Sequence, residues 1–366
     1  MVIAVTELQQ MPTSGARAVE AISVDGLELL AVPQLALDVP DQPAGMNAGD
    51  SGTDLLLMLR QDGRYVPFSK LPAPGGEDAE FFAIGGRSFL AVASIRDGAG
   101  PYRYTTTSRI FEWRDGGFVQ FQDITTYAAK QWKHWSIGER HFLGLAQGLE
   151  VPHVEGPNRV SMIYEWDGSS FVEFQRVPSR WAYNWHPFSF DDAFFVAHAD
   201  HLDPSWLYRW DGERLVPHQV LLERAGRSFA YFSRNGGHHL LVAGIDQPPT
   251  LMRWDGSRFD AVQQLAGPGA RELKVVEHQG RLFVIRVNFI VGTPAAPRPA
   301  LMSQVYEWRD GALTVVAEFP TCGGTDAEIV ATGDDVQFVV SNSLTPSLRF
   351  ASRTVLYELS ADETTE

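Results

Sequence analysis

The chain has 366 residues, of which 44% are hydrophobic and 11% aromatic, so it holds enough apolar side chains for a large buried core. Its formal net charge of -15 argues against nucleic acid and anionic membrane surfaces as partners. The single cysteine, Cys322, excludes a disulfide framework within one chain. No apolar run is long enough to span a membrane, and the first residues lack the basic and apolar regions of a signal peptide. We therefore expect a cytoplasmic protein without membrane insertion.

A short motif recurs along the chain: apolar and aromatic residues, then Glu or Arg, then Trp, then a turn containing Asp-Gly. Degenerate copies without the Trp occur at residues 57–63 and 355–359. Each copy predicts a strand, a tight turn and a second strand, and a period of about 44 to 54 residues is typical of a β-propeller with one blade per repeat. The five full copies contain Trp113, Trp166, Trp210, Trp254 and Trp308.

In chain order, the apolar segments predict an all-β fold, a seven-bladed β-propeller with four antiparallel strands per blade. The last blade lacks an outer strand, and the apolar residues 1–11 are predicted to supply it, which joins the chain ends and removes an open sheet edge. We expect a single domain, 1–366. The predicted ranges are 17–70 for blade 1, 78–124 for blade 2, 131–177 for blade 3, 184–221 for blade 4, 227–265 for blade 5, 270–319 for blade 6 and 326–360 for the inner strands of blade 7.

The repeated Trp residues end the third strand of each blade, midway out from the axis. An aromatic side chain at that position covers a large area between stacked sheets. We therefore interpret the five Trp residues as packing between blades and not as ligand contacts.

Two repeat patterns invite comparison with known propellers. Trp-Asp at 166–167, 210–211 and 254–255 is similar to the WD repeat, but no Gly-His dipeptide opens a blade. The segments 79–84, Phe-Leu-Ala-Val-Ala at 89–93 and 163–175, with its Ile-Tyr-Glu-Trp, resemble the EPTP or EAR repeats of the epilepsy-associated LGI proteins. The resemblance implies a seven-bladed propeller, and because family members are protein-binding modules, it also implies a binding function.

The predicted connections differ between the two faces of the propeller. The turns within the first and second hairpin of each blade are short, whereas the loops between the second and third strands are long and rich in Pro and Gly. Because function concentrates on such loops, we predict a site for a protein or small-molecule ligand on that face, over the central channel. The long loops are 34–53, 96–108, 147–161, 289–302 and 343–353.

The first residues of the inner strands are predicted to open on the same face. Crowded carboxylates raise one another's pKa, which suits acid–base chemistry, so an enzyme of the cyclase, isomerase or hydrolase type is the alternative to a binding module. Side chains that accept backbone N–H groups of a neighbouring blade would favour the binding module, and a concave pocket with perturbed carboxylates would favour the enzyme. The predicted ring is Glu20, Glu80, Lys133, His186, Phe229 or Ser228, Glu272 and Glu328.

Three further groups of residues are chemically suggestive. Aromatic and charged residues near the predicted mouth of blades 3 and 4 are candidates for ligand contact. The spacing of His198, Asp200 and His201 is compatible with a metal, but one loop rarely supplies a whole site, so we predict neither a metal nor an organic cofactor. Cys322 has no base nearby in the sequence and is interpreted as an inert thiol. The ligand-contact candidates are Trp132, His134, Arg180 and Tyr183.

Overall fold

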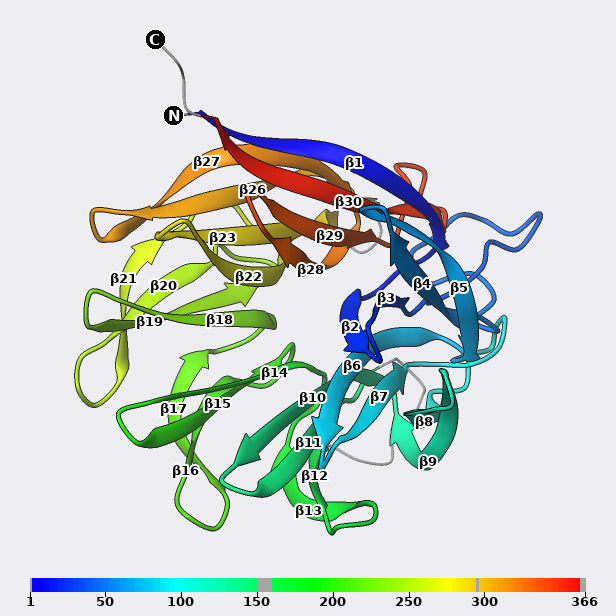
Figure 1. The fold of residues 1–366 in the computed structure, drawn as a ribbon, viewed down its shortest axis with the longest axis horizontal. Coiled ribbons are helices and arrows are strands. Elements are labelled where there is room, and N and C mark those ends of the chain that lie inside the picture. The colour runs from blue at the N-terminus through cyan, green and yellow to red at the C-terminus, as the bar shows by residue number, and fades with distance from the viewer. Residues whose placement is uncertain (1, 151–159, 294–295, 363–366) are drawn as a thin grey trace.

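The computed structural model describes residues 2–150, 160–293 and 296–362, which form seven four-stranded antiparallel sheets arranged around a common axis (Figure 1). These residues contain no helix, and hence none that is long and apolar enough to cross a membrane. The predicted all-β, seven-bladed propeller is confirmed.

In blades 1 to 6 the strands pair in chain order from the axis outwards, and in blade 7 the order is β28, β29, β30 and then the first strand of the chain. The inner two strands of blades 1 to 7 are β2 (Glu20–Val24) and β3 (Leu27–Val32), β6 (Gly76–Ile84) and β7 (Arg87–Ser94), β10 (Ala129–Ile137) and β11 (Arg140–Gln147), β14 (Ala182–Phe190) and β15 (Ala193–Asp200), β18 (Gly226–Arg234) and β19 (Gly237–Gly244), β22 (Ala270–His278) and β23 (Arg281–Asn288), and β28 (Gly324–Thr332) and β29 (Val336–Asn342).

The outer two strands continue each sheet towards the rim. For blades 1 to 6 they are β4 (Asp54–Gln61) and β5 (Arg64–Pro72), β8 (Thr105–Arg114) and β9 (Gly117–Tyr127), β12 (Val160–Trp166) and β13 (Phe171–Pro178), β16 (Ser205–Trp210) and β17 (Leu215–Leu222), β20 (Thr250–Trp254) and β21 (Phe259–Gln264), and β26 (Ala300–Arg309) and β27 (Ala312–Cys322). A small hairpin, β24 (Val291–Thr293) and β25 (Ala296–Arg298), lies in the long loop of blade 6.

Blade 7 is completed by the start of the chain. Strand β1 (Val2–Ser14) pairs antiparallel with β30 (Ala351–Asp362), and the register shifts once, between Glu7 and Gln9. Side chains of β1 are buried where they face the core, as at Ile3 and Met11. The predicted closure by the N-terminal strand is therefore confirmed.

The hydrophobic core lies between neighbouring blades. One cluster joins Phe89 of blade 2 to Trp132 and Tyr164 of blade 3, and equivalent clusters repeat around the ring. The repeated Trp residues belong to these clusters: the ring of Trp166 lies 5.6 Å from Phe89, and that of Trp210 lies 5.5 Å from Phe142, each in the preceding blade. The interpretation of these residues as packing between blades is consistent with this geometry.

The outer strands are joined by a repeated glutamine clasp. The side chain of Gln122 donates to the carbonyl of Phe171 at 2.8 Å and accepts the N–H of the same residue at 2.9 Å. Both backbone groups belong to the next blade, so each clasp fixes one blade against another. The pairs are Gln9 with Tyr65, Gln122 with Phe171, Gln175 with Leu215, Gln219 with Phe259 and Gln263 with Leu313.

Most inner strands begin earlier than the sequence predicts. Strand β10 begins at Ala129 instead of near Lys133, and β14 begins at Ala182 instead of near His186. A small residue opens each of these strands, and at Gly226 of β18 the neighbouring segment is close: a Cβ there would lie 2.2 Å from the Ser205 hydroxyl oxygen and 3.0 Å from the Asp200 carbonyl oxygen. Of the predicted long loops, residues 151–159 and 294–295 lie outside the described residues.

Candidate binding site in the central channel

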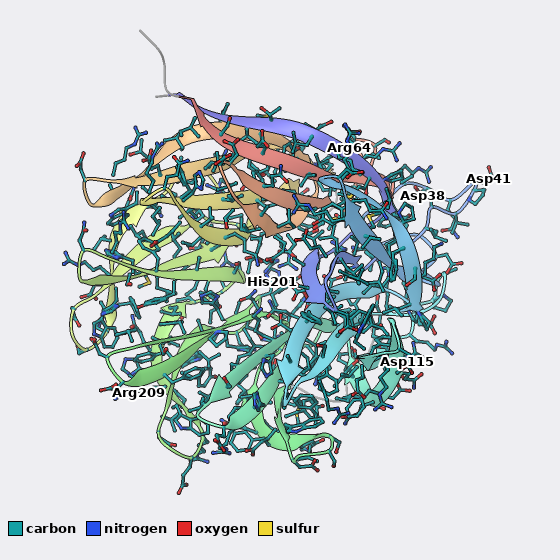
Figure 2. The ribbon with its side chains drawn as sticks, viewed as in Figure 1. Asp38, Asp41, Arg64, Asp115, His201 and Arg209 are labelled. Carbon is teal, nitrogen blue, oxygen red and sulfur yellow. The ribbon has the colours of Figure 1, made fainter. Side chains whose placement is uncertain are left out.

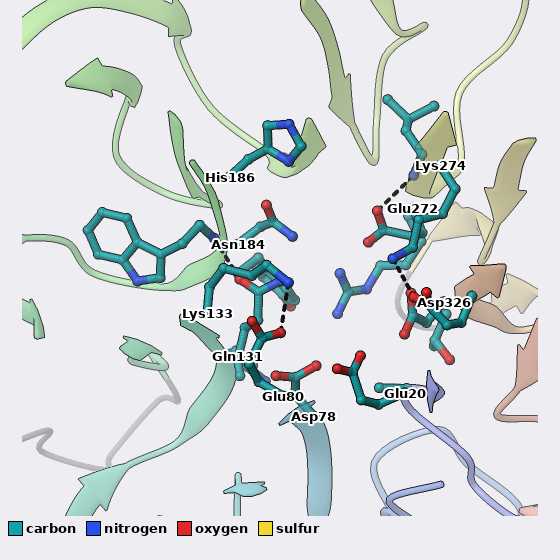
Figure 3. A pocket seen from close by; sticks show the side chains of 18 of the residues that line it. Glu20, Asp78, Glu80, Gln131, Lys133, Asn184, His186, Glu272, Lys274 and Asp326 are labelled. Atoms are coloured by element: carbon teal, nitrogen blue, oxygen red, sulfur yellow. Dashed lines mark hydrogen bonds and ion pairs between the residues drawn. The ribbon is translucent and has the colours of Figure 1, made fainter. Parts of the chain in front are cut away.

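A cavity of about 290 Å³ lies on the propeller axis and is lined by the inner strands of the blades. Figure 3 shows side chains from these strands converging on its centre. All six titratable candidates of the predicted ring line this cavity, together with Tyr183: they are Glu20, Glu80, Lys133, His186, Glu272 and Glu328.

The lining is built from three layers, because the inner strands repeat the same local sequence. In blades 2 to 7 the inner strand begins with a small residue, and Ala16 holds the equivalent place before β2. The residues of the cavity lining are mainly the first, second and fourth after this small residue. The mouth layer, the one nearest the long loops, is Arg17, Glu77, Lys130, Tyr183, Arg271 and Thr325; the middle layer is Ala18, Asp78, Gln131, Asn184, Glu272 and Asp326; the inner layer is Glu20, Glu80, Lys133, His186, Ala230, Lys274 and Glu328. In blade 5, Arg227 and Ser228 hold the mouth and middle positions of the repeat without lining the cavity.

A β-bulge explains why two successive residues face the axis. The pairing of β6 with β7 skips from Gly76 to Asp78, so Glu77 is the extra residue, and the pairing of β10 with β11 skips Lys130 in the same way. A bulge re-aims the side chain of the extra residue. The same skip occurs at Tyr183, Arg227, Arg271 and Thr325, so six of the seven blades place a bulged residue at the mouth position of the repeat.

The inner layer contains the predicted ring with two corrections. The residue of blade 6 in this layer is Lys274 and not Glu272, which lies in the middle layer. The residue of blade 5 is Ala230 and not Phe229 or Ser228. In both blades several neighbouring positions are polar or small, so the sequence alone does not show which residue of the strand belongs to the inner layer.

The inner layer links neighbouring blades. A carboxylate oxygen of Glu20 accepts the N–H of Phe81 at 2.8 Å, Glu80 accepts that of His134 at 3.0 Å, and the Nε2 atom of His186 accepts that of Tyr231 at 3.1 Å. The second oxygen of Glu80 pairs with the ammonium of Lys133 at 2.7 Å. Lys274 pairs with Glu328 at 2.6 Å in the same way.

The middle layer makes equivalent contacts and holds perturbed carboxyl groups. Asp78 accepts the N–H of Trp132 at 2.8 Å, and Asp326 accepts that of Val19 at 3.0 Å. Burial raises the pKa of Asp78 well above its usual range and that of Asp326 to about 7. Burial, with Glu80 and Glu328 nearby, also raises the pKa of Glu20. The cavity thus combines side chains bonded to backbone with perturbed carboxyl groups.

The mouth layer was not predicted from the sequence, and it is rich in cations. Arg17, Lys130 and Arg271 surround the single carboxylate of Glu77, and the side chains of Glu77 and Lys130 are only 3% and 5% exposed. Burial favours the neutral acid, but the three cations outweigh it and lower the pKa of Glu77. The available signal was a basic residue three positions before four members of the inner layer: Arg17, Lys130, Arg227 and Arg271.

Tyr183 lies among these cations. The guanidinium of Arg227 lies 3.9 Å from the centre of its ring, that of Arg271 4.9 Å and the ammonium of Lys130 5.3 Å. Burial would raise the pKa of the Tyr183 hydroxyl, but the three cations outweigh it and lower this pKa. Burial lowers the pKa of Arg227 to about 10 and also lowers that of Lys130.

The other three ligand-contact candidates do not line the cavity. Trp132 is fully buried and packs 5.8 Å from Tyr164. His134 stacks on Phe82 between blades, with a ring separation of 4.6 Å. Arg180, which precedes β14 on the loop-rich face, pairs with Glu150 at 2.6 Å.

The residues with metal-like spacing are engaged with the protein itself. The two oxygens of Asp200 accept four backbone N–H groups, those of residues 180, 181, 202 and 203. His198 contacts Trp185 with a ring separation of 4.0 Å, and His201, which lies near the axis (Figure 2), has its Nδ1 atom 3.1 Å from the Arg227 guanidinium. Within the described part of the chain, no group of three or more His, Cys, Asp or Glu is arranged to hold a metal ion.

Cys322 is partly buried at the end of β27. Burial raises the pKa of its thiol to about 11, so the thiolate is disfavoured at neutral pH.

Comparison with known proteins identifies the repeat. The family model described as "EPTP domain" matches residues 64–114, 117–167 and 170–211. The mouse thrombospondin-type laminin G domain and EAR repeat-containing protein is 32% identical over 130 residues, which are 34% of this chain and 17% of the relative. Its human counterpart is 29% identical over 181 residues, which are 48% of this chain and 25% of the relative. The matched segments thus span a quarter or less of these relatives.

Among solved structures, the WD40 β-propeller domain of Doa1 aligns with a TM-score of 0.54 at 11% identity, over 99% of this chain and 98% of that one. This likeness concerns the fold alone. Residues 64–211 therefore carry EPTP repeats, and the resemblance to the EPTP/EAR repeat family that the sequence predicts is confirmed.

Proposed function

We propose that the chain is a binding module that engages a ligand or a protein partner on its loop-rich face, over the axial cavity. The EPTP propeller fold supports a protein-interaction module. The observation that carries the choice of face is the cavity itself, which is about 290 Å³, is lined by all seven blades and has its layer richest in cations at the end nearest the long loops. Binding sites are concave and combine a few converging polar groups with apolar walls.

The loops around this mouth offer contact surface. Leu37, in the long loop of blade 1, is 46% exposed and is one of the large apolar side chains that this face presents to solvent. The loop is held by reciprocal backbone bonds between Leu37 and Asp50 at 2.8 and 2.9 Å. A partner that covered this loop would bury the side chain without reordering the backbone, which lowers the entropic cost of binding.

The test compares two faces of the molecule. A peptide library and a small-molecule library are screened against the intact chain, and each hit is measured again with Leu37→Asp, Ala230→Trp and Val172→Asp. Ala230 lines the cavity, so a tryptophan there fills it, whereas Val172 is 44% exposed on the outer strand β13 and serves as the matched control for Leu37. We expect hits to be weakened at least about tenfold by one of the first two variants and not by the third. Hits that only Val172→Asp weakens would contradict the choice of face.

An acid–base enzyme is the second candidate, and it is favoured by the carboxyl group of Asp326, whose pKa burial raises to about 7. A group that titrates near neutral pH can both give and take a proton. The test follows a mixture of small metabolites by NMR in the presence of the chain. Turnover that Asp326→Asn abolishes would support the enzyme, and an unchanged mixture would leave the binding module.

A further inference from the structure

The mouth cluster, defined as Arg17, Lys130, Arg271 and Glu77, has an imbalance of charge. Three cations from blades 1, 3 and 6 share the carboxylate of blade 2, at 3.5, 4.0 and 3.9 Å. The whole chain carries a formal net charge of -15, so this excess of positive charge runs against its composition. All four side chains are nine-tenths buried or nearly so, with exposed fractions of 12%, 5%, 10% and 3% in the order given.

The cluster also lacks hydrogen bonds. Within the described residues, the side chains of Arg17, Lys130 and Arg271 make no hydrogen bond, and the Nε atom of Arg17 and an oxygen of Glu77 are buried without a partner. Buried charges are normally paired and hydrogen-bonded, because an unpaired one is costly.

The other cations of the channel follow that rule. Lys133 and Lys274 of the inner layer contact their carboxylates at 2.7 and 2.6 Å. Arg227 donates to the carbonyls of Ala225 and Gly226 at 3.3 and 2.7 Å. The mouth cluster is therefore the part of the cavity whose donors remain available to a ligand.

We propose that the mouth cluster binds a carboxylate group of a ligand whose remaining part is neutral or cationic. Resting on the proposed binding function of this face, the inference specifies its ligand chemistry. Planar guanidinium groups match a carboxylate with two parallel hydrogen bonds, and Arg17 of blade 1 and Arg271 of blade 6 approach from the two sides of blade 7. The ammonium of Lys130 adds a third donor, so one carboxylate satisfies donors that Glu77 leaves free.

The deeper layers limit the charge of the rest of the ligand. Below the mouth, the middle and inner layers present more carboxyl groups than cations, among them Asp78, Glu20, Glu272 and Asp326, and only Lys133 and Lys274 oppose them. A second anionic group at that depth would find no unpaired cation, because Lys133 and Lys274 already pair with Glu80 and Glu328, whereas an ammonium or a neutral donor would meet carboxyl oxygens. A polyanion does not suit this lining.

The carboxylate can come from a free small acid or from an acidic side chain of a partner protein, and the experiment separates these sources. Isothermal titration at fixed ionic strength measures the intact chain with 4-aminobutanoate, with butylamine, and with the blocked peptides acetyl-Ala-Asp-Ala-amide and acetyl-Ala-Asn-Ala-amide. We expect at least one carboxylate probe to bind at least about tenfold more tightly than its counterpart without the carboxylate. Tighter binding of the free acid indicates a small molecule, and tighter binding of the peptide indicates a protein side chain.

Variants locate the site. Arg271→Gln and Lys130→Gln should each weaken the bound probe about tenfold, whereas Glu77→Gln, which removes the competing carboxylate, should tighten it. Arg214→Gln removes a positive charge from an exposed turn at the opposite face and should leave binding unchanged. Melting curves are recorded first, and if the two cation variants do not fold, the direction of the Glu77→Gln effect decides.

Two results would overturn the inference: no carboxylate probe binds the intact chain up to about 20 mM, or the probes bind equally to all folded variants. This failure differs from failure of the proposed function. If library hits lose affinity with Leu37→Asp or Ala230→Trp but the binding of none depends on a carboxylate, the proposed binding face is supported and the proposed carboxylate site is rejected.

Discussion

His186 replaces a carboxylate in the inner layer. Its Nε2 atom accepts the N–H of Tyr231 at 3.1 Å, the contact that Glu20 and Glu80 make in blades 1 and 2. Only the neutral ring can accept at this atom. Burial, followed by the cations Lys133 and Lys274, lowers the pKa of His186 to about 3.

This contact predicts acid sensitivity. The ordinary pKa of histidine is 6.5, so between pH 6.5 and about 3 the unfolded chain binds a proton at His186 that the folded chain does not. Stability is therefore lost as pH falls through this range. His186→Gln keeps an acceptor of suitable length, so we expect unfolding free energies near the wild type at pH 7 and a smaller loss on acidification to about pH 4.5, as measured by urea denaturation.

The comparison of two proteins isolates the histidine. The raised pKa of Asp326 acts in the opposite direction, since its folded form holds a proton that the unfolded form releases between pH 3.8 and about 7. That contribution is common to both proteins and cancels in the difference. Parallel pH profiles for wild type and His186→Gln would show that the Tyr231 contact does not control the ionisation of the ring.

At this scale the sequence predicted part of the site. Glu20, Glu80, Lys133 and His186 hold the same position in successive repeats, so aligning the repeats was enough to bring them together. The mouth layer was not predicted because its residues face the axis only as a result of β-bulges. Strict alternation along a strand would turn the side chains of Glu77 and Lys130 away from the axis. In blade 6 the run Arg-Glu-Leu-Lys offers two polar residues two positions apart, and the sequence does not say which belongs to the inner layer.

At the scale of elements, the outer strands depend on side chains to hold neighbouring blades together. The sheets share no backbone ladder with one another, so neighbouring blades are held by hydrophobic clusters, side-chain contacts and single backbone bonds between loops, such as that from the Ala225 N–H to the His201 carbonyl at 2.8 Å. Each glutamine clasp supplies a donor and an acceptor to one backbone residue of the next blade, as Gln122 does with Phe171. The sequence shows two of the glutamines, Gln122 and Gln175, as part of Phe-Gln, but their partners lie in the next repeat and are visible only in the fold.

Removal of one clasp should weaken the blade interface. Gln122→Ala deletes two hydrogen bonds and leaves the N–H and carbonyl of Phe171 without these partners, so we expect a loss of about 1–3 kcal/mol in the free energy of unfolding. Gln120, two residues earlier on β9, is exposed and provides a matched substitution, Gln120→Ala, with an expected loss below about 0.5 kcal/mol. Equal losses for the two variants, measured by urea denaturation, would show that the clasp contributes nothing beyond the strand itself.

At the scale of the whole molecule, closure of the ring depends on β1. Its side chains join a cluster with Leu30 and Met58 of blade 1, and Gln9 forms the clasp with Tyr65. The first strand of the chain is thus the outermost strand of its blade and carries a clasp, as β9 and β13 do in blades 2 and 3. It also covers the edge of β30 that would otherwise be open.

Deletion of residues 1–14 should therefore open the propeller. We expect the truncated chain to melt at lower temperature and to associate, because both the edge of β30 and the apolar surface of blade 1 become exposed. Size-exclusion chromatography with light scattering measures the association. Gln9→Ala keeps the strand and loses only the clasp, so it should remain monodisperse to the same extent as the wild type; association of this point variant would assign closure to the clasp and not to strand pairing.

The matched EPTP repeats share a boundary that differs from that of the blades. Each begins at an outer strand, as at Arg64 in β5, and ends after the third strand of the next blade, as at Arg114 in β8. If every repeat is counted from an outer strand to the third strand of the next blade, the described blade strands fall into seven such units. The first unit is β1 to β4 and the last is β27 to β30, so β1 is the first strand of a repeat like the others. The turn between the third and fourth strands of any blade is then a boundary between two repeats. Near the chain ends, Ala4 pairs with Ser360, so the two ends lie close together at such a boundary. A circular permutant that joins those ends and opens between Asp115 and Gly116 should keep the native topology and the native melting temperature, whereas one opened between Gly85 and Gly86 divides a repeat and should melt lower.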